Sequence, residues 1–471
     1  MFGFTELELR TYLILVFCMG LQVLINQIEE PYARSLIHCE VPVNATLGAE
    51  PSGSGHCGDR LYVIGEGAKL SGSGQSLENV GRFVITLFVS GFADSHGRKA
   101  ATLVGWCCIL ASVVCFFLAS FLRTYAVPLF IAAQGLQGMS GIGLMLEIVT
   151  GDIAQQVGDT VAVYSRRDMM GMFLGIIFFG MVLGIQYAAI TEFMFVWAAV
   201  VAFSVVILVL LIAVFPETQA EDEQRQEHTA LKDVILNELR DYRRFMTENR
   251  FIKFTVAASF FDNMSGGISA IIMPWIMAYN GYTQLELMVR GMPMIVVGLP
   301  LMPLVPWLCK KCGHRATWNL CYLYDKVLNL AFLPFLQLDW GLPMLLTLQY
   351  CKLPINGFGS VVSSVSVRIV GVKINAKFQA MNQINGFLCG SFSSLMYSRV
   401  FSATATHPLA ILSPMIISSA FSLVSMAVYW RGHREIVLGE CDKLTAEAKE
   451  AEGKEAEGKE AEKPQEEKKT D

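Results

Sequence analysis

Several charged and polar residues lie inside long apolar stretches of the sequence. Asp262 and Asn263 stand in one stretch, Asp325 and Lys326 in a second, and Lys352 in a third. Charged groups are costly in an apolar interior, so each is a candidate for a functional role. A carboxylate whose proton affinity changes with its exposure to water can couple proton movement to another process, and Asp262 is our candidate for this chemistry. For Asp325 we favour a structural ion pair with Lys326 or Lys352.

A second group of residues has the types and spacing of a tight turn between two helices. The segment 90–103 reads SGFADSHGRKAATL and contains Asp94, Gly97, Arg98 and Lys99. A turn this short needs glycine, and a carboxylate stabilises the positive N-terminal end of a neighbouring helix. The alternative is a solvated turn whose basic residues only orient the chain in a membrane.

The composition indicates which elements must position these residues. Of the 471 residues, 53% are hydrophobic and 16% are charged, and the mean hydropathy is +0.46. This leaves too little polar surface for a soluble globule, so apolar surface must face lipid. A helix needs about 20 apolar residues to cross a bilayer. Twelve runs fit, at residues 11–28, 76–93, 100–122, 126–150, 169–190, 193–215, 252–279, 287–308, 316–337, 341–363, 379–400 and 408–430. We therefore predict an all-α membrane protein with twelve transmembrane helices.

The distribution of Lys and Arg predicts the topology. With both termini in the cytoplasm, the cytoplasmic segments up to Arg434 carry 20 Lys and Arg and the outer segments carry five, as the positive-inside rule requires. The charged stretch 216–250 divides the runs into two six-helix bundles, residues 1–215 and 251–434. We expect residues 435–471, with the sequence AEGKEAEGKEAEK, to form a disordered charged tail.

This topology places residues 29–75 on the outer side as a long loop. The loop contains a glycosylation sequon at Asn44 and the cysteines Cys39 and Cys57, all of which suit an oxidising compartment. Spacing alone does not fix a disulfide, so a bond between these cysteines and two free thiols are both left open. The first run is long enough to span a membrane, so we do not expect a cleaved signal peptide.

The segment 90–103 resembles motif A of the major facilitator superfamily. Asp94, Gly97, Arg98 and Lys99 match in register, and Ser90 replaces the first glycine of the motif. The resemblance implies the fold of that family, in which two six-helix bundles rock against each other. It also implies that Asp94 and Arg98 form a latch against the eleventh helix.

A degenerate second copy of the motif follows the eighth run. In LCKKCGHRATW, residues 308–318, Gly313, His314 and Arg315 stand where the first copy has Gly, Arg and Lys, and Lys310 replaces the aspartate. The repeat supports two related halves.

Other positions are similar to the charge network of the family near the cytoplasmic ends of helices four to six. They are Asp152, Arg166 or Arg167, and Glu217 in the FPET that closes the sixth run. The resemblance implies that they join the motif A latch. Gln134 stands where motif B has an arginine associated with proton coupling, so that route of coupling lacks its residue.

A closer resemblance covers the first third of the chain. EEPYARSLIHC at residues 29–39, followed by a sequon, a Gly and Ser stretch and a second cysteine, is similar to the outer entry of the proton-coupled folate transporter family, solute carrier family 46, and of related fungal facilitators. FADSHGRK also looks like the DSxGRR turn of that family. We carry no substrate over from it.

These features predict a secondary transporter that moves a small organic solute, with or without protons, by alternating access. The candidates for solute binding or proton coupling are Asp262, Asn263, Gln134, Asp325, Lys352 and Asn356. No enzyme, metal, cofactor or nucleic-acid motif is present, and we expect a monomer in the plasma membrane or an endomembrane. The alternative is a non-transporting scaffold or receptor on the same fold.

Overall fold

The structure, a computed structural model, describes most of the chain. It covers residues 5–37, 60–157, 193–218, 249–280, 304–335, 358–370, 372–405, 412–432 and 434–447, together with isolated positions between them. Every regular element within these residues is a helix. The predicted sites at Cys39, Asn44, Cys57 and Asn356 lie outside the described residues, as do most of the predicted runs 169–190, 287–308 and 341–363.

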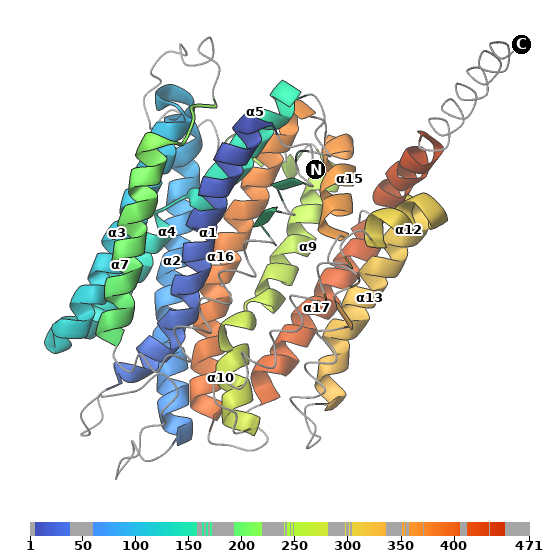
Figure 1. Ribbon diagram of the computed structural model, residues 1–471. Coiled ribbons are helices and arrows are strands. Elements are labelled where there is room, and N and C mark those ends of the chain that lie inside the picture. The colour runs from blue at the N-terminus through green and yellow to red at the C-terminus, as the bar shows by residue number, and fades with distance from the viewer. Residues whose placement is uncertain are drawn as a thin grey trace, which may run out of the picture.

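The first half of the chain forms a helical bundle (Figure 1). Its helices are α1 (Glu6–Ser35), α2 (Arg60–His96), α3 (Arg98–Phe121), α4 (Ala126–Gly138), α5 (Ile142–Val157) and α7 (Phe193–Ala213). Buried aromatic rings join them, because Phe116 of α3 stacks on Trp197 of α7 at 4.5 Å between ring centroids, and Tyr32 of α1 lies 5.5 Å from the same indole. Aromatic pairs in this distance range add to the free energy gained by burial.

The second half contributes a second group of helices (Figure 1). They are α9 (Arg250–Gly266), α10 (Ser269–Asn280), α12 (Leu304–Cys312), α13 (His314–Phe335), α15 (Phe358–Val370), α16 (Val372–Thr404) and α17 (Ser413–Gly432), followed by a helix at residues 434–447. α17 packs against α9 and α13.

Five stretches of the described residues are long and apolar enough to cross a membrane. They are Glu6–Ser35, Arg98–Phe121, Arg123–Ile153, Phe193–Ala213 and Ser413–Gly432. α2 and α16 are also long, at 37 and 33 residues, but their Gly, Ser and charged residues make them less apolar. Residues of this kind are expected where a membrane helix contacts another helix instead of lipid.

Two predicted runs are interrupted helices. The run 126–150 is divided between α4 and α5, with Gly141 at φ 61° between them. The run 252–279 is divided between α9, which ends at Gly266, and α10, which begins at Ser269. Interrupted membrane helices leave backbone groups available for binding at the middle of the bilayer.

α2 and α16 lie side by side where the two halves meet (Figure 1). Their shared surface, which we call the α2–α16 seam, consists of Gly65, Gly72, Ser76 and Asn79 of α2 and Gly390, Ser391, Ser398 and Ser402 of α16. A Cβ atom on Gly72 would lie 2.3 Å from Ser398 Oγ, and Ser76 Oγ lies 2.9 Å from Ser391 Oγ. Only small side chains allow two helices to approach this closely.

The prediction that residues 29–75 form an outer loop was wrong for residues 29–35 and 60–75, which are helical. α1 continues through Ser35 and α2 already begins at Arg60. The glycines and serines of residues 65–75 were expected to belong to this loop. They lie instead on a helix, and their small size lets α16 pack closely against it. Glu78 and Arg82, predicted at the start of the second run, therefore stand in the middle of a long helix.

The end of the seam farthest from the chain termini is closed by large apolar side chains. Ile64 of α2 packs with Trp275 of α10 and with Tyr397 and Phe401 of α16, and all four are at most 2% exposed. We call this group the outer apolar cluster, after the side of the membrane predicted for this end. In Figure 1, α10 lies at the opposite end of the molecule from the N- and C-termini.

The start of the predicted disordered tail is a docked helix. In residues 434–447, the side chains of Val437, Leu438 and Cys441 are at most 4% exposed and pack against the core that contains Cys309 and Trp318. These positions recur at helical spacing on one face, and their burial stabilises the helix. The prediction of disorder was therefore wrong for residues 435–447, and residues 448–471 lie outside the described part.

Candidate functional site

The turn between α2 and α3 is built on Gly97. Its φ of 90° and ψ of 156° are open to glycine and strained for other residues. The carboxylate of Glu217, just after α7, accepts hydrogen bonds from Arg98 N at 2.9 Å and Lys99 N at 3.1 Å. The negative side chain thus caps the first free amides of α3, where the helix dipole is positive.

The side chains of the same turn continue the network. Arg98, which is 7% exposed, donates from Nε to Asp152 Oδ2 of α5 at 2.9 Å. The hydroxyl of Thr218 donates to the same oxygen at 3.3 Å, and Lys99 Nζ donates to the carbonyl of Ile212 at 3.0 Å. We call Arg98, Lys99, Asp152, Glu217 and Thr218 the cytoplasmic cluster, after the side of the membrane predicted for this turn. It joins α3, α5 and the end of α7.

Either Arg166 or Arg167 was predicted to join this network, and each of them forms an ion pair elsewhere. Arg166 Nη2 lies 2.6 Å from Glu8 Oε1, and Arg167 Nη1 lies 2.7 Å from Glu147 Oε1. Sequence reasoning missed Glu8, although Thr5 and Glu8 have the spacing of a capping box and form one at the start of α1. Asp94 lies on α2, but its side chain is outside the described part of the structure.

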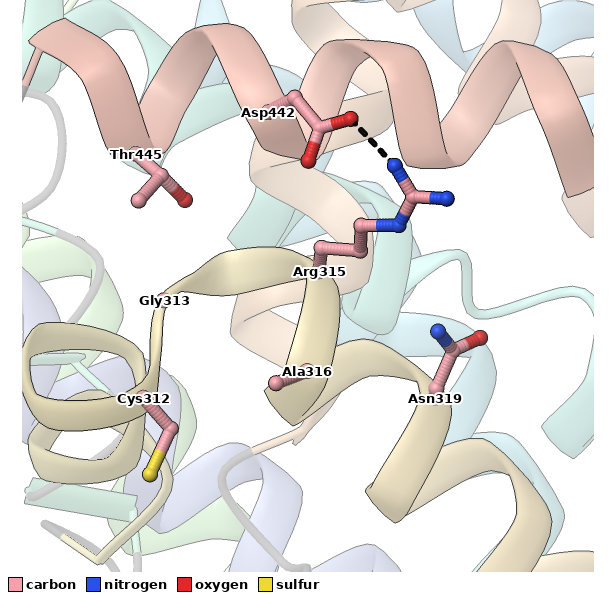
Figure 2. A pocket seen from close by; sticks show the side chains of 7 residues that line it. All are labelled: Cys312, Gly313, Arg315, Ala316, Asn319, Asp442 and Thr445. Atoms are coloured by element: carbon pink, nitrogen blue, oxygen red, sulfur yellow. Dashed lines mark hydrogen bonds and ion pairs between the residues drawn. The ribbon is translucent and has the colours of Figure 1, made fainter.

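The degenerate copy of the turn is built in the same way. Gly313 has φ 84°, and His314 N, at the start of α13, donates to Thr445 Oγ1 at 3.0 Å. Figure 2 shows Arg315 pointing to Asp442, with 2.7 Å between Nη1 and Oδ2. The cap thus comes from residues 434–447, which follow α17 as Glu217 follows α7.

A pocket lies between this turn and the docked helix (Figure 2). It is lined by Cys312, Gly313, Arg315, Ala316, Asn319, Asp442 and Thr445. Arg368 of α15 adds hydrogen bonds to Glu440 at 3.2 Å and Glu447 at 2.6 Å. Although burial raises it, hydrogen bonds from Lys443 and Arg368 hold the pKa of Glu440 below its ordinary value. These contacts attach residues 434–447 to the second half of the chain.

The charged residues inside the second half form two ion pairs. Lys326 Nζ, on a side chain 8% exposed, lies 2.5 Å from Asp262 Oδ1, and Lys352 Nζ lies 3.8 Å from Asp325 Oδ1. Of the two partners predicted for Asp325, the structure therefore selects Lys352. Asn263 Nδ2 donates to Ser259 Oγ at 3.1 Å, one turn back on α9.

A polar group in the first half contains one predicted site residue, Gln134, and one that was not predicted as a site, Glu29. Gln134 of α4 is 1% exposed, and a Cβ atom on Gly74 of α2 would lie 2.8 Å from its Cγ. Glu29, which the sequence analysis placed in the outer loop, is 7% exposed. The error follows from ending the first helix at residue 28, because α1 continues to Ser35.

A comparison with known protein families agrees with this geometry. The profile of the Major Facilitator Superfamily matches residues 70–394. This segment includes the Gly97 turn, the ion pairs Asp262–Lys326 and Asp325–Lys352, and part of the α2–α16 seam. The chain belongs to the Major Facilitator Superfamily.

Solved structures of transporters share the fold. A mutant of the nucleoside transporter NupG is 13% identical with a TM-score of 0.62, and 90% of this chain and all of that chain are covered. The human organic anion transporter MFSD10 (TETRAN) is 14% identical with a TM-score of 0.61 at 90% and 100% coverage. A D-xylose-proton symporter is 16% identical with a TM-score of 0.60 at 89% and 98% coverage. No curated protein sequence matches the chain.

The family and the fold define the class of protein. The chain is an integral, multi-pass membrane protein of a family that carries small solutes across membranes, and it is a transporter, not an enzyme. The resemblance to solute carrier family 46 is not tested by these likenesses and stays a prediction.

Proposed function

We propose that this protein is a secondary carrier that moves a small organic solute by alternating access between two six-helix bundles, with twelve spans and both termini in the cytoplasm. The observation that carries the proposal is the α2–α16 seam. Its small side chains pack closely without interlocking, so the two halves can separate there without forcing large side chains past each other.

The cytoplasmic cluster supports the same mechanism. It fixes α3, α5 and the end of α7 together through the Glu217 cap and the Arg98–Asp152 pair, so the first half moves as one body. The turn at Gly313 and the helix at residues 434–447 serve the second half in the same way. Rigid bodies that meet at a separable surface are what a rocking mechanism needs.

Interior polar residues of both halves favour an organic solute. Asp262 with Lys326, and Lys352 with Asp325, place both signs of charge inside the second half, and Gln134 adds an amide in the first. A few placed polar groups among apolar walls are typical of organic ligand sites. The solved relatives carry a nucleoside, organic anions and xylose by their names, so we propose this range of solutes for the first screen, with protons as the coupling ion.

The test is solute flux in proteoliposomes, with and without a pH gradient. A panel of nucleosides, organic anions, folates and sugars would be compared between wild type and Asp152→Asn, which removes the charge partner of Arg98. Flux of one solute class that falls in Asp152→Asn, but not in a control such as Glu6→Gln at an exposed position, supports the carrier. If the folded protein transports no solute, the result favours the alternative hypothesis of a non-transporting scaffold or receptor.

The motion itself can be measured without knowing the solute. Spin labels at Tyr62 and Ala403, both exposed near the outer apolar cluster, report the separation of α2 and α16, after the native cysteines are replaced by serine. Two populated distances would support alternating access. A single distance under every condition tested would contradict it.

A further inference from the structure

The first half contains a buried cluster of carboxylates and amides whose charges do not balance. Glu29 of α1 and Glu78 of α2 are 7% and 3% exposed. Glu78 forms an ion pair with Arg82, one turn further along α2. Glu29 interacts electrostatically with both of these residues. Two ionised carboxylates and one guanidinium leave one negative charge that the cluster does not neutralise.

The close crossing of α2 and α4 holds this cluster together. A Cβ atom on Gly138 of α4 would lie 2.0 Å from the carbonyl oxygen of Glu78, so the two backbones touch at this point. The crossing brings Gln134 and Gln137 of α4 next to Glu29. Both amides are at most 1% exposed, so the cluster is shielded from water on this side.

The cluster also lacks hydrogen-bond donors. Within the described part of the chain, three of its buried acceptor atoms have no hydrogen-bond partner: Glu29 Oε1, Gln134 Oε1 and Gln137 Oε1. The donor group of Gln137 is directed to Asn26 Oδ1 at 2.6 Å. A buried acceptor without a donor is costly, and these three belong to one site. A single added proton would supply a donor and remove the excess charge together.

Other charged groups near the cluster do not provide this neutralisation. α7 contains no charged residue. The charged residues of α3 and α5 lie toward the Gly97 turn, where Arg98 bonds Asp152 and Glu147 bonds Arg167. Arg34 stands five residues after Glu29 on α1, about 7.5 Å further along the helix, and its side chain packs against Gly67, eleven residues before Glu78 on α2. Arg82 is the one cation of the described residues that contacts the carboxylates.

We infer that Glu29 and Glu78, with Arg82 and the two glutamines, form a site that holds one proton shared between the two carboxyl groups. A metal cation is a poorer occupant, because the guanidinium of Arg82 already lies against Glu78 and would repel it. Arg82, whose side chain is 35% exposed, is the member of the site that reaches the surface.

The Glu29–Glu78 pair is a better candidate than Asp262 for coupling a proton to transport. This step rests on the proposed function. Asp262, the candidate from the sequence, already has Lys326 as its counter-ion. The Glu29–Glu78 pair has one cation for two acids, so its charge changes when a proton leaves. A net charge is costly in the membrane interior, so loss of the proton favours a conformation in which the site is exposed to water.

The test is infrared difference spectroscopy of the purified protein between neutral and alkaline pH. The carbonyl stretch of a protonated carboxyl group should be present at neutral pH in wild type. It should be lost in Glu29→Gln and in Glu78→Gln, because either substitution leaves one carboxylate balanced by Arg82. Glu6→Gln, at an exposed position of α1, should keep the band.

The outcomes separate the possibilities. A band that survives in either variant, in protein shown to be folded by its thermal transition, overturns the inference. A rise in melting temperature with sodium at alkaline pH that is lost in Glu29→Gln would assign the site to a metal cation and also overturn it. The measurement needs no solute, so it can succeed or fail independently of flux in proteoliposomes.

Discussion

Single residues at the turns before α3 and α13 determine how these two helices begin. Gly97 and Gly313 both have positive φ, and each is followed by a helix whose first amide is capped by a side chain from a distant segment. The caps differ in chemistry, a carboxylate from Glu217 in one half and a hydroxyl from Thr445 in the other. The two turns therefore share their geometry although their capping groups differ.

Replacing Gly97 by alanine should destabilise the protein by roughly 1–3 kcal/mol, because a side chain is strained at this φ. The new Cβ would also lie 2.5 Å from Glu217 Oε2 and displace the cap. Thermal unfolding in detergent measures the effect. Gly143→Ala, where a Cβ meets no atom within 4 Å, is the matched control, and equal loss in both variants would contradict this account.

The ion pair of Asp262 and Lys326 makes a second prediction at this scale. Asp262→Asn leaves the buried ammonium of Lys326 without its counter-ion, which we expect to cost roughly 2 kcal/mol, less than for a fully buried pair because the Asp262 side chain is 41% exposed. Adding Lys326→Met should recover most of the stability. A double variant no more stable than Asp262→Asn would argue against the pairing.

At the scale of elements, the helix at residues 434–447 depends on charge. The folded pKa of Glu440 lies below its ordinary value of 4.5, so its ionised form favours docking. This contribution is complete above the ordinary pKa and is lost as the pH falls through the lower folded value. The helix should therefore loosen in acid before the membrane helices do.

Removing the cation tests the same element at neutral pH. Arg368→Gln deletes the guanidinium that bonds Glu440 and Glu447, and amide hydrogen exchange in residues 434–447 should become faster, by several-fold or more. α17 should be unaffected, and so should the exposed control Glu435→Gln. Unchanged exchange in Arg368→Gln would show that Val437, Leu438 and Cys441 dock the helix without help from charge.

The interrupted helices show what sequence can and cannot predict about an element. The break near Gly266 follows Ser265 and precedes Gly267, a pattern that the sequence displays. The break at Gly141 also follows a serine, Ser140, and has Gly138 and Gly143 close by. Which of these glycines takes the positive φ depends on contacts such as the hydrogen bond from Gln22 to Ser140 at 3.0 Å. Tertiary contacts of this kind are not encoded in local spacing.

For the whole molecule, composition and motif A were sufficient to predict a helical transporter of the Major Facilitator Superfamily. The sequence also identified Asp152 and Glu217, because both stand at positions that match the family's motifs. The partner of Lys326, the Thr445 cap and the burial of Glu29 were not. Each depends on how a helix is rotated about its axis or on which distant segment packs against it, and hydropathy reports neither.

The relation between the two halves can be shifted through the seam. Gly72→Leu would place a side chain where Ser398 and Ser394 approach α2, so we expect the outer distance between labels at Tyr62 and Ala403 to lengthen by a few ångströms. Gly359→Leu, at a position with nothing within 4 Å of a Cβ, should leave the distance unchanged. An unchanged distance in Gly72→Leu would mean that the seam yields without opening.

The proposed opening of the seam would make transport depend on temperature through the outer apolar cluster. If α2 separates from α16, water would reach the side chains of Ile64, Trp275 and Phe401, which are buried in this structure. Hydrating apolar surface raises the heat capacity, so the enthalpy of opening grows with warming. The balance between open and closed forms should then follow a curved van't Hoff plot, and turnover measured at one temperature would not extrapolate simply to another.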